Sequence, residues 1–410
     1  MNQLHGPNSS AALNGDLGDQ RKYLFEDLFV TEDMIPFQPM VIVLDGLDNC
    51  GDDRSSQTAL ARSLVALATS LPWIKIVISS RDRPDLRAVF NKRCHLVDIK
   101  TDTHVRDDIR LYVQSRIKDT ASFPPDGLRC NETDIGRLVS KADGLFEWCS
   151  VVFRYLEDCV DPAHDLQELL AGRGVADALP GLFALYDDVL AFRFSSSKDI
   201  CALREILGVI FVSSATQPLS VTSIARFLPS HGLSTVRRMI QLLSPVLYCA
   251  QGEVVRAHHL SFHDYLESKF DTAAEGWPSL SDVHSDMAIA CLGIMHQELR
   301  FNICNLTDSS VLNKDVPDLG TRIARCLSPE LLYGSSFWMT HVASATTPGL
   351  DSGGDAKVCA LVRGLVCDRR VLYWLEVLSL AGRAEQSITI LRQCGRHFAV
   401  STGVPRCVRI

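Results

Sequence analysis

The sequence predicts an α/β lobe containing a partial parallel sheet, followed by a long all-α region. Met40–Leu44 is an unbroken apolar run, and Ile74–Ile78 is a second run interrupted only by a lysine. An amphipathic segment separates the two runs, which is the strand, helix, strand order of a parallel sheet. From about residue 103 onward, apolar residues recur at three-to-four spacing along most of the chain, which indicates helices.

The elements of the lobe can be placed from their ends. Residues 1–20 are rich in Asn, Gly and Ser, and we expect a disordered tail there. Acid and hydroxyl side chains over Asp52–Ser56 are suited to cap the helix that follows them. The expected elements are a helix over Arg21–Val30, a strand over Met40–Leu44, a helix from Thr58, a strand over Ile74–Ser79, a short helix from Pro84 and a third strand over His95–Ile99.

The all-α region divides into three parts. The first contains four amphipathic segments, at Val105–Ile117, Thr133–Lys141, Leu145–Val160 and Gly181–Phe194. The second is typical of a winged helix, because three helices precede a hairpin and one follows it. Its elements are helices over Ile200–Val212, Val221–Phe227 and Thr235–Leu243, strands over Val246–Ala250 and Val254–His258, and a helix over Phe262–Lys269. The third part, from Asp282 to about Arg396, is again helical.

Composition favours a cytoplasmic globular protein. Forty-one basic and 49 acidic side chains give a formal net charge of −8, which argues against a nucleic-acid partner. The N-terminus lacks the basic and apolar regions of a signal peptide, and the longest apolar segment, Ile206–Val212, is too short for a membrane span. The 14 cysteines include no C-x-x-C pair, so we expect scattered thiols in a reducing compartment.

Two acids follow the first strand directly. Asp45 comes at its C-terminal end and Asp48 three residues later. Open α/β sheets hold ligands at this end of their strands, and carboxylates are ligands for Mg²⁺. The same acids are also common turn formers and helix caps, so taken alone they indicate either a metal site or a turn.

Four segments, in this order and at these separations, resemble the fungal NACHT family of the STAND class of P-loop NTPases, which is of the nephrocystin-3-like and NOD-like receptor type. They resemble its extended Walker B segment, its sensor 1 strand, the nucleotide-facing turn of its helical domain and its winged-helix histidine motif. The segments are Val41–Asp52, Ile76–Arg81, Lys141–Trp148 and His258–Leu266.

The resemblance implies a domain order and a signalling function. Residues 21–102 would be a partial nucleotide-binding lobe, 103–195 a helical domain, 196–272 a winged helix and 273–410 a C-terminal helical arm. The implied function is a switch driven by ATP and ADP, with other NACHT-type or signalling proteins, or further copies of this chain, as partners. The alternative is a non-catalytic interaction module or adaptor derived from such a protein.

The resemblance also assigns roles to individual residues. Asp45 would bind Mg²⁺ directly or through water, and Asp48 would support the metal shell. Arg81 would contact the γ-phosphate, and His259 would donate to the β-phosphate. Gly144 would allow close backbone approach to the nucleotide because it lacks a Cβ.

The sequence departs from the family at three places, and one of them is Phe146 in the adenine-side turn, where many relatives carry proline. Asn49 stands where the family usually has the glutamate that orients the attacking water, and an amide is not a base. No G-x-x-x-x-G-K-[ST] phosphate loop occurs in the chain, so we expect a truncated or degenerate relative that does not hydrolyse ATP by itself. The resemblance implies that the ancestral site bound Mg²⁺ with ATP or ADP. This chain either still binds these ligands or binds none. The missing phosphate-loop strand would also leave the edge of Lys75–Ser79 unpaired, unless the strand predicted over His95–Ile99 or another chain fills the place.

Other interpretations of these segments remain open. Arg81 could be a solvated surface charge, and His258, His259 and His263 could form a zinc site, although further ligands are not evident. A winged helix can bind DNA, but the recognition-helix equivalent offers only Arg237 and Arg238 to phosphates. The aromatic residues at helical spacing are expected in the core: Phe146, Trp148, Trp338 and Trp374.

Overall fold

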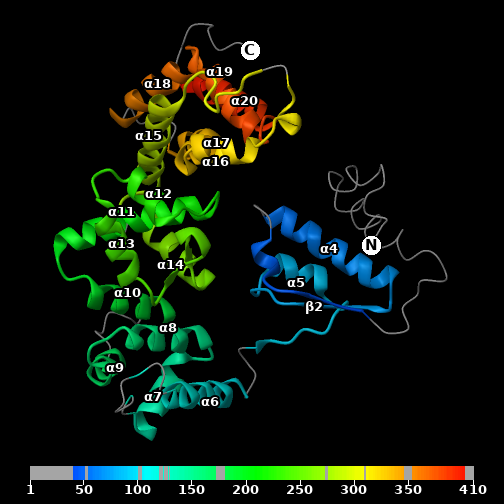
Figure 1. Cartoon of the computed structure of the whole chain (residues 1–410). Helices are drawn as coiled ribbons and strands as arrows, with labels where there is room; N and C mark the ends of the chain where they lie inside the picture. Colours follow the sequence, from blue (N-terminus) through cyan, green and yellow to red (C-terminus); the bar gives the residue numbers. More distant parts are fainter. Residues whose placement is uncertain are drawn as a thin grey trace. The chain divides into compact units, whose positions relative to one another are not determined.

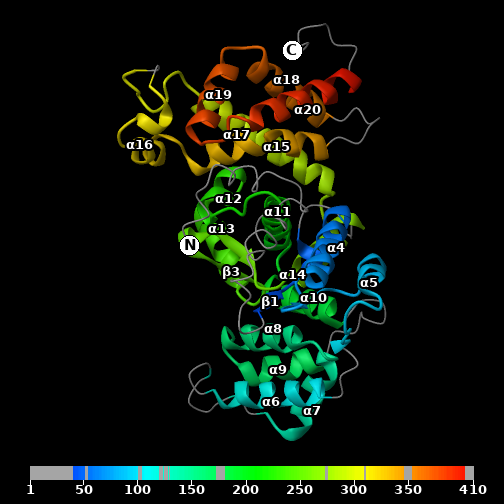
Figure 2. The same ribbon diagram turned by 90° about the vertical axis from the view of Figure 1, so that its right-hand side faces the viewer.

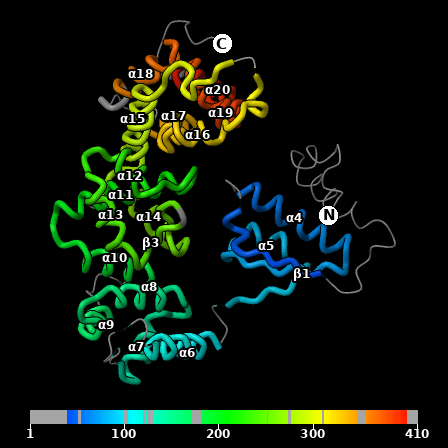
Figure 3. The backbone as a smooth tube through the Cα atoms, viewed as in Figure 1, coloured from blue at the N-terminus to red at the C-terminus, as the bar shows by residue number. Residues whose placement is uncertain are grey.

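The computed structural model describes residues 40–50, 54–99, 104–119, 123, 128, 130–171, 181–272, 276–308, 311–345 and 353–401 (Figure 1). The tail predicted over residues 1–20 and the helix predicted over Arg21–Val30 lie outside these ranges. The chain forms two compact units, residues 1–102 and 103–410, and each is described by itself. Figure 3 traces the backbone of both units.

The first unit contains a parallel pair of strands, as the sequence predicts. Strands β1 and β2 pair in register from Met40 opposite Ile74 to Leu44 opposite Ile78. Helix α4 connects them and α5 follows β2, and their apolar residues form a small core with the 3-10 turn η3. The elements are β1 (Met40–Leu44), η3 (Leu47–Asn49), α4 (Arg54–Ser70), β2 (Ile74–Ile78) and α5 (Pro84–Phe90).

The third strand predicted over His95–Ile99 is wrong. Residues 95–98 have no regular structure and Ile99 lies in a 3-10 turn. In the described part of the chain, this sheet contains β1 and β2 alone. An apolar run becomes a strand only where another strand supplies hydrogen-bond partners, and here neither β1 nor β2 does so.

The second unit is mostly helical. Seventeen α-helices occur in the described residues of the whole chain, and fifteen of them lie in this unit. In two views, α6–α9, α10–α14 and α15–α20 follow one another along the unit (Figures 1 and 2). Its first nine helices are α6 (Val105–Lys118), α7 (Glu132–Ala142), α8 (Phe146–Glu157), α9 (Pro162–Ala171), α10 (Gly181–Arg193), α11 (Ser197–Ser214), α12 (Val221–Phe227), α13 (Leu233–Leu242) and α14 (Leu260–Asp271).

The remaining elements are a hairpin and the C-terminal helices. Strands β3 and β4 pair antiparallel between α13 and α14, where the sequence predicts a hairpin. Helices α15 and α17 pack along each other and form the centre of the C-terminal group. These elements are β3 (Leu247–Cys249), β4 (Val255–Ala257), α15 (Leu280–Glu298), α16 (Leu319–Cys326), α17 (Pro329–Ala345), α18 (Gly353–Val366), α19 (Arg370–Leu380) and α20 (Gln386–Ser401). No helix within the described ranges has the length and apolar character needed to cross a bilayer.

Side-chain caps explain where several helices start. Asn131 accepts from the backbone N–H of Asp134, and Asp134 accepts from that of Asn131, which forms a capping box at α7. The serines before α11, α12 and α15 also accept a backbone N–H. Helix α9 is an addition to the predicted elements, although Pro162 at its first turn is a recognisable start signal.

The predicted aromatic core is largely correct. Trp148, Trp338 and Trp374 are buried. Phe146 is the exception, because 43% of it is exposed; its ring makes a T-shaped contact with the Tyr112 ring, with the centroids 5.8 Å apart. Phe146 is the first residue of α8, and the buried side chains of this helix begin at Trp148.

A buried carboxylate joins α12 to the C-terminal helices. The Glu330 side chain is only 5% exposed, and it accepts from Ser223 Oγ at 2.6 Å and from Arg226 Nη1 at 2.7 Å. Arg226 also pairs with Glu298 on α15. The Arg226 guanidinium therefore compensates the charges of two carboxylates from two helices. Without it, Glu330 would keep only its hydrogen bond from Ser223 among the described contacts.

A chain of polar groups, two of them fully buried, also joins the C-terminal end of α11 to α15 and α17. His341 is fully buried, with its Nδ1 2.9 Å from Nδ1 of His284 and its Nε2 2.9 Å from the Tyr333 hydroxyl. Tyr333 in turn contacts Thr216 Oγ1 at 3.0 Å. Burial, helped by the neighbouring His284, lowers the pKa of His341 to about 3, and burial also lowers the pKa of His284.

We expect Arg226→Met to reduce the free energy of unfolding by about 3 kcal/mol, because it leaves the buried Glu330 carboxylate without its cation. Urea denaturation followed by circular dichroism measures this. Arg238→Met is the matched control: it breaks the more exposed pair with Asp199 and should cost less than about 1 kcal/mol. An equal loss of unfolding free energy in the two variants would contradict the conclusion that Arg226 compensates a buried charge.

We also expect stability to fall as the pH drops below about 6.5. The folded-state pKa values of His284 and His341 lie below the unfolded value, so the unfolded chain binds more protons in this window. The loss should approach about 1.4 kcal/mol per pH unit for each histidine that stays neutral. Urea denaturation at several pH values between about 7 and 5 measures the slope. His341→Gln should reduce the slope, whereas His164→Gln, at an exposed position, should leave it unchanged.

Candidate functional site

The C-terminal ends of β1 and β2 meet at one edge of the first unit. Asp45 follows β1 and precedes Gly46, whose φ of +70° turns the chain into η3. A Cβ added at Gly46 would lie 3.0 Å from the Asn49 side chain, so both conformation and space favour glycine here. This turn places Asp45, Asp48 and Asn49 next to the end of β2.

Ser79 links the two strand ends. Its hydroxyl donates to Asp45 Oδ1 and accepts from the Gly46 backbone N–H at 2.9 Å. Its backbone N–H donates to the Leu44 carbonyl at 2.9 Å, and its carbonyl accepts from Leu47 at 3.0 Å. Asp45 itself is exposed, so Ser79 holds an accessible carboxylate in place.

Asp48 and Arg81 bind each other. Arg81 Nε lies 2.7 Å from Asp48 Oδ2, and the Arg81 backbone N–H donates to Asp48 Oδ1 at 3.1 Å. Arg81 also donates to Asn49 Oδ1 at 3.3 Å. Burial of the Asp48 carboxyl raises its pKa, but the backbone N–H and guanidinium of Arg81 outweigh this and leave the pKa below its usual value.

The structure therefore brings four of the predicted site residues together: Asp45, Asp48, Asn49 and Arg81. The side-chain oxygens of Asp45, Asp48 and Asn49 are the hard ligands that Mg²⁺ takes, and Mg²⁺ commonly uses one or two carboxylates while keeping several waters. Asp45, with the adjacent Ser79 hydroxyl, fits this pattern. Asp48 fits it only after releasing Arg81, because its side chain is 5% exposed and already bound to the guanidinium.

Gly144 lies in the second unit, between α7 and α8. Its φ is +81°, and Asp143 before it also has a positive φ of +46°. A Cβ at Gly144 would meet only Val105, at 4.0 Å. The left-handed backbone, rather than crowding, therefore favours glycine at this position.

His259 caps the N-terminus of α14. Its Nδ1 accepts the backbone N–H of Ser261 at 3.1 Å, and the Ser261 hydroxyl also contacts Tyr186 Oη at 2.8 Å. Because Nδ1 accepts, the neutral ring carries its proton on Nε2. The His259 side chain is exposed, and no contact of Nε2 is found with the described residues. That N–H can donate to an anion.

The structure does not bring His258, His259 and His263 together as a zinc site. Among the described residues, the group able to hold a metal at this place consists of His263, Asp264 and Glu267, and it includes neither His258 nor His259. The His263 ring packs against Phe211, with centroids 4.5 Å apart. Three neighbouring side chains on one helix are common without a metal, and we assign none here.

The arginines of α13 bind carboxylates of the same chain. Arg237 pairs with Glu253 beside the hairpin, and Arg238 pairs with Asp199 at 2.8 Å. A DNA phosphate would have to compete with these acids. The arrangement gives no support to DNA binding through α13.

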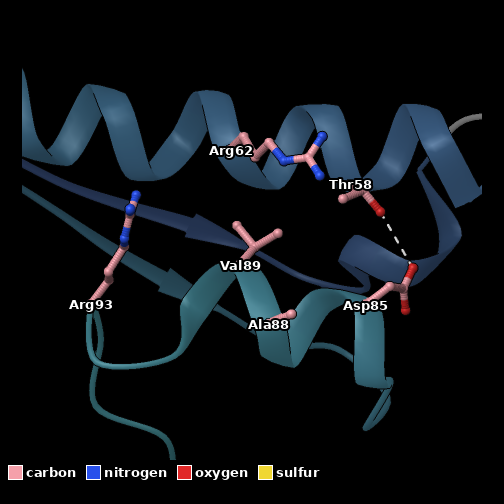
Figure 4. A pocket seen from close by; sticks show the side chains of 6 residues that line it. All are labelled: Thr58, Arg62, Asp85, Ala88, Val89 and Arg93. Carbon is pink, nitrogen blue, oxygen red and sulfur yellow. Dashed lines mark hydrogen bonds between the residues drawn. The ribbon is translucent and has the colours of Figure 1, made fainter.

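A hollow of about 440 Å³ lies between α4 and α5 (Figure 4). The Thr58 hydroxyl donates to Asp85 across it at 3.3 Å. Arg83 lowers the pKa of Asp85 to about 2. None of the predicted site residues lines this hollow, so it is separate from the strand ends. Its lining residues are Thr58, Arg62, Asp85, Ala88, Val89 and Arg93.

Ser79 and Tyr186 are the site neighbours that sequence reasoning missed. A hydroxyl residue at the end of the second strand is a usable signal, because it must lie near the acid that ends the first strand. Nothing in the sequence near Tyr186 links it to His259, since 73 residues separate them and only folding joins them through Ser261.

The chain is similar to vegetative incompatibility protein HET-E-1 from Podospora anserina, with 23% identity over 383 residues. The match covers 86% of this chain and 26% of that protein, so the chain spans about a quarter of its relative. It supports a common origin with fungal NACHT-type proteins. No protein-family profile and no solved structure matches the chain.

We expect Ser79→Ala to loosen the strand ends. It removes the hydrogen bonds of the Ser79 hydroxyl to Asp45 and to the Gly46 N–H. Hydrogen exchange at Gly46 should become about five-fold faster, which corresponds to about 1 kcal/mol. Ser80→Ala is the control, because that hydroxyl donates to the adjacent Arg81 carbonyl and has no hydrogen bond to Gly46, and it should leave exchange at Gly46 unchanged.

Proposed function

We propose that this chain is a signalling switch of the NACHT/STAND type whose strand ends form the magnesium side of a nucleotide site. The observation that carries the proposal is the cluster of Asp45, Asp48, Asn49 and Arg81 at one edge of two parallel strands. Ligands of open α/β sheets bind at this edge. The similarity to HET-E-1 along most of the chain supports the same origin.

In this proposal, the residues of the first unit hold the metal and the terminal phosphate. Asp45 is the metal carboxylate and Ser79 orients it. Arg81 exchanges its contact with Asp48 for a phosphate oxygen, which is a charge-assisted hydrogen bond. The amide of Asn49 is not a base and cannot accept a proton from an attacking water. The switch therefore changes state by exchange of nucleotide rather than by rapid hydrolysis.

The family resemblance also assigns nucleotide contacts to two residues of the second unit. Nε2–H of His259 would donate to the β-phosphate, and the backbone at Gly144 would allow close approach of the nucleotide. The winged helix, residues 196–272, and the helical arm, residues 273–410, carry the conformational response. ADP and ATP shift such an equilibrium only by the difference in their contacts with its two states.

A second candidate function is a non-catalytic interaction module. It is favoured by the pairing of Asp48 with Arg81, because the two side chains bind each other and neither is then available to a metal or a phosphate. In that case the helical surfaces of the second unit bind a signalling partner and the strand ends serve only to fold the first unit.

Nucleotide binding separates the two candidates. We expect Mg²⁺·ADP to bind the chain weakly, with a dissociation constant between about 10 μM and 1 mM, measured by calorimetry. Asp45→Ala and chelation of Mg²⁺ should each weaken binding at least about ten-fold, or about 1.4 kcal/mol.

Asp82→Asn is the matched control, because it removes one acidic charge from the same unit at the exposed pair with Arg87 and should leave affinity unchanged. Binding that survives Asp45→Ala, or an absence of binding up to about 10 mM nucleotide, would reject the switch and leave the interaction module.

A further inference from the structure

The hollow between α4 and α5 in the first unit has one wall from each helix. Thr58 and Arg62 lie about one turn apart on α4, so their side chains share a face. Asp85, Ala88 and Val89 have three-to-four spacing on α5 and form the opposite wall. The volume of about 440 Å³ lies in the range of pockets that hold small organic molecules.

Two arginines that line the hollow have no acidic partner. No ion pair or hydrogen bond of the Arg62 or Arg93 guanidinium is found with the described residues. By contrast, Arg81, Arg83 and Arg87 of the same unit each bind an aspartate. A guanidinium matches the geometry of carboxylate and phosphate groups. Two unpaired guanidinium groups around one hollow therefore indicate a ligand with negative charge.

The Asp85 carboxylate does not cancel the charge of these two arginines, because Arg83 already binds it. Arg83 Nε donates to Asp85 Oδ1 at 3.1 Å, and Arg83 Nη2 donates to Oδ2. The Thr58 hydroxyl also contacts Oδ2, at 3.3 Å. The pair of Arg83 with Asp85 is neutral as a whole, so the hollow keeps the positive charges of Arg62 and Arg93.

The two unpaired guanidinium groups lie toward different ends of the hollow. Helical side chains point back toward the N-terminus of their helix, and Arg62 extends along α4 toward Thr58 (Figure 4). Arg93 follows the end of α5 and lies on the other side of Val89 in the same view. Because a helix rises about 1.5 Å per residue, Asp85 in the first turn of α5 and Arg93 beyond its end are roughly 10 Å apart.

Hydrogen bonds hold the turn that carries Arg93. The N–H of Asn91 donates to the Arg87 carbonyl at 2.9 Å, and the N–H of Arg93 donates to the Phe90 carbonyl at 3.0 Å. The Cys94 thiol donates to the same Phe90 carbonyl at 3.1 Å. Phe90 is buried in the small core of the unit. The Arg93 backbone is therefore tied to that core, and its exposed side chain can adjust to a ligand.

We propose that the hollow binds a small organic molecule that carries an anionic group, phosphate or carboxylate, at each end. Arg62 binds one anionic group and Arg93 binds the other, through charge-assisted hydrogen bonds. The uncharged middle of the molecule lies against Ala88 and Val89, the apolar residues of the hollow. None of these residues belongs to the cluster at the strand ends, so this site is independent of the proposed nucleotide switch.

Calorimetry on the full chain, without Mg²⁺ or nucleotide, tests this site. The probe is hexanediol bisphosphate, whose two phosphates can reach both arginines, and we expect a dissociation constant between about 10 μM and 1 mM. Hexyl monophosphate and the shorter ethanediol bisphosphate can engage only one arginine at a time. Each should bind at least about ten-fold more weakly. Octanedioate carries a carboxylate at each end, and the tighter of the two long dianions identifies the anionic group that the site takes.

Arg62→Gln and Arg93→Gln should each weaken the binding of hexanediol bisphosphate at least about ten-fold, to the level of hexyl monophosphate. Both arginines are exposed, so the variants should fold, and circular dichroism checks this. Arg87→Gln is the matched control. It removes the same charge from an exposed position on α5 that pairs with Asp82 and does not line the hollow, and it should leave the affinity unchanged.

Three results would overturn the proposal. They are no binding of either long dianion up to about 10 mM, equal affinity for the long dianions and hexyl monophosphate, and an equal loss of affinity in the Arg87→Gln and Arg93→Gln variants. Asp45→Ala should not change the affinity for hexanediol bisphosphate. Since Mg²⁺ and nucleotide are absent throughout, this site can be confirmed where Mg²⁺·ADP binding fails, and the reverse.

Discussion

The tie between the two strand ends is the contact on which the candidate site depends. A parallel pair of strands is weak by itself, because few hydrogen bonds hold it, and Val41, Val43 and Val77 on one of its faces are more than half exposed. Ser79 fastens the end of β2 to Asp45 and Gly46, and Arg81 fastens it to Asp48. These contacts determine where the Asp45 carboxylate lies. Any use of that carboxylate for a metal therefore depends on Ser79 and Arg81, which follow the end of the other strand.

Buried polar groups have a comparable role in the second unit. Glu330 with Ser223 and Arg226, and His341 with His284, cross between helices far apart in sequence. A buried polar group left without its partner costs more than its hydrogen bond contributes, so each contact disfavours other alignments of α12, α15 and α17. Apolar packing alone would permit small shifts among these helices. The polar contacts select one arrangement.

Local signals predicted most elements, and the failures concern contacts between distant residues. Apolar runs and an N-terminal proline mark β1, β2 and α5, because strands and helix starts depend on nearby residues. The run from His95 to Ile99 carries the same apolar signal but finds no neighbouring strand, and pairing is not encoded locally. At the site, the sequence suggests Asp48 and Arg81 as separate ligand contacts. Their mutual pairing, across 33 residues, follows only from the fold.

The pairing of Asp48 with Arg81 also determines the free-energy cost of binding a phosphate at this edge. Arg81 is 53% exposed, so moving its side chain into water costs little, whereas the Asp48 side chain, 5% exposed, would be left buried and charged. Release of Arg81 toward a phosphate is therefore unfavourable unless a second cation replaces it at Asp48. In the proposed switch, a magnesium ion at Asp45 would supply that cation, since Asp48 follows Asp45 by three residues in the same turn. In that proposal, metal and phosphate binding would be coupled through the Asp48 carboxylate, because the metal would replace the guanidinium that the phosphate draws away.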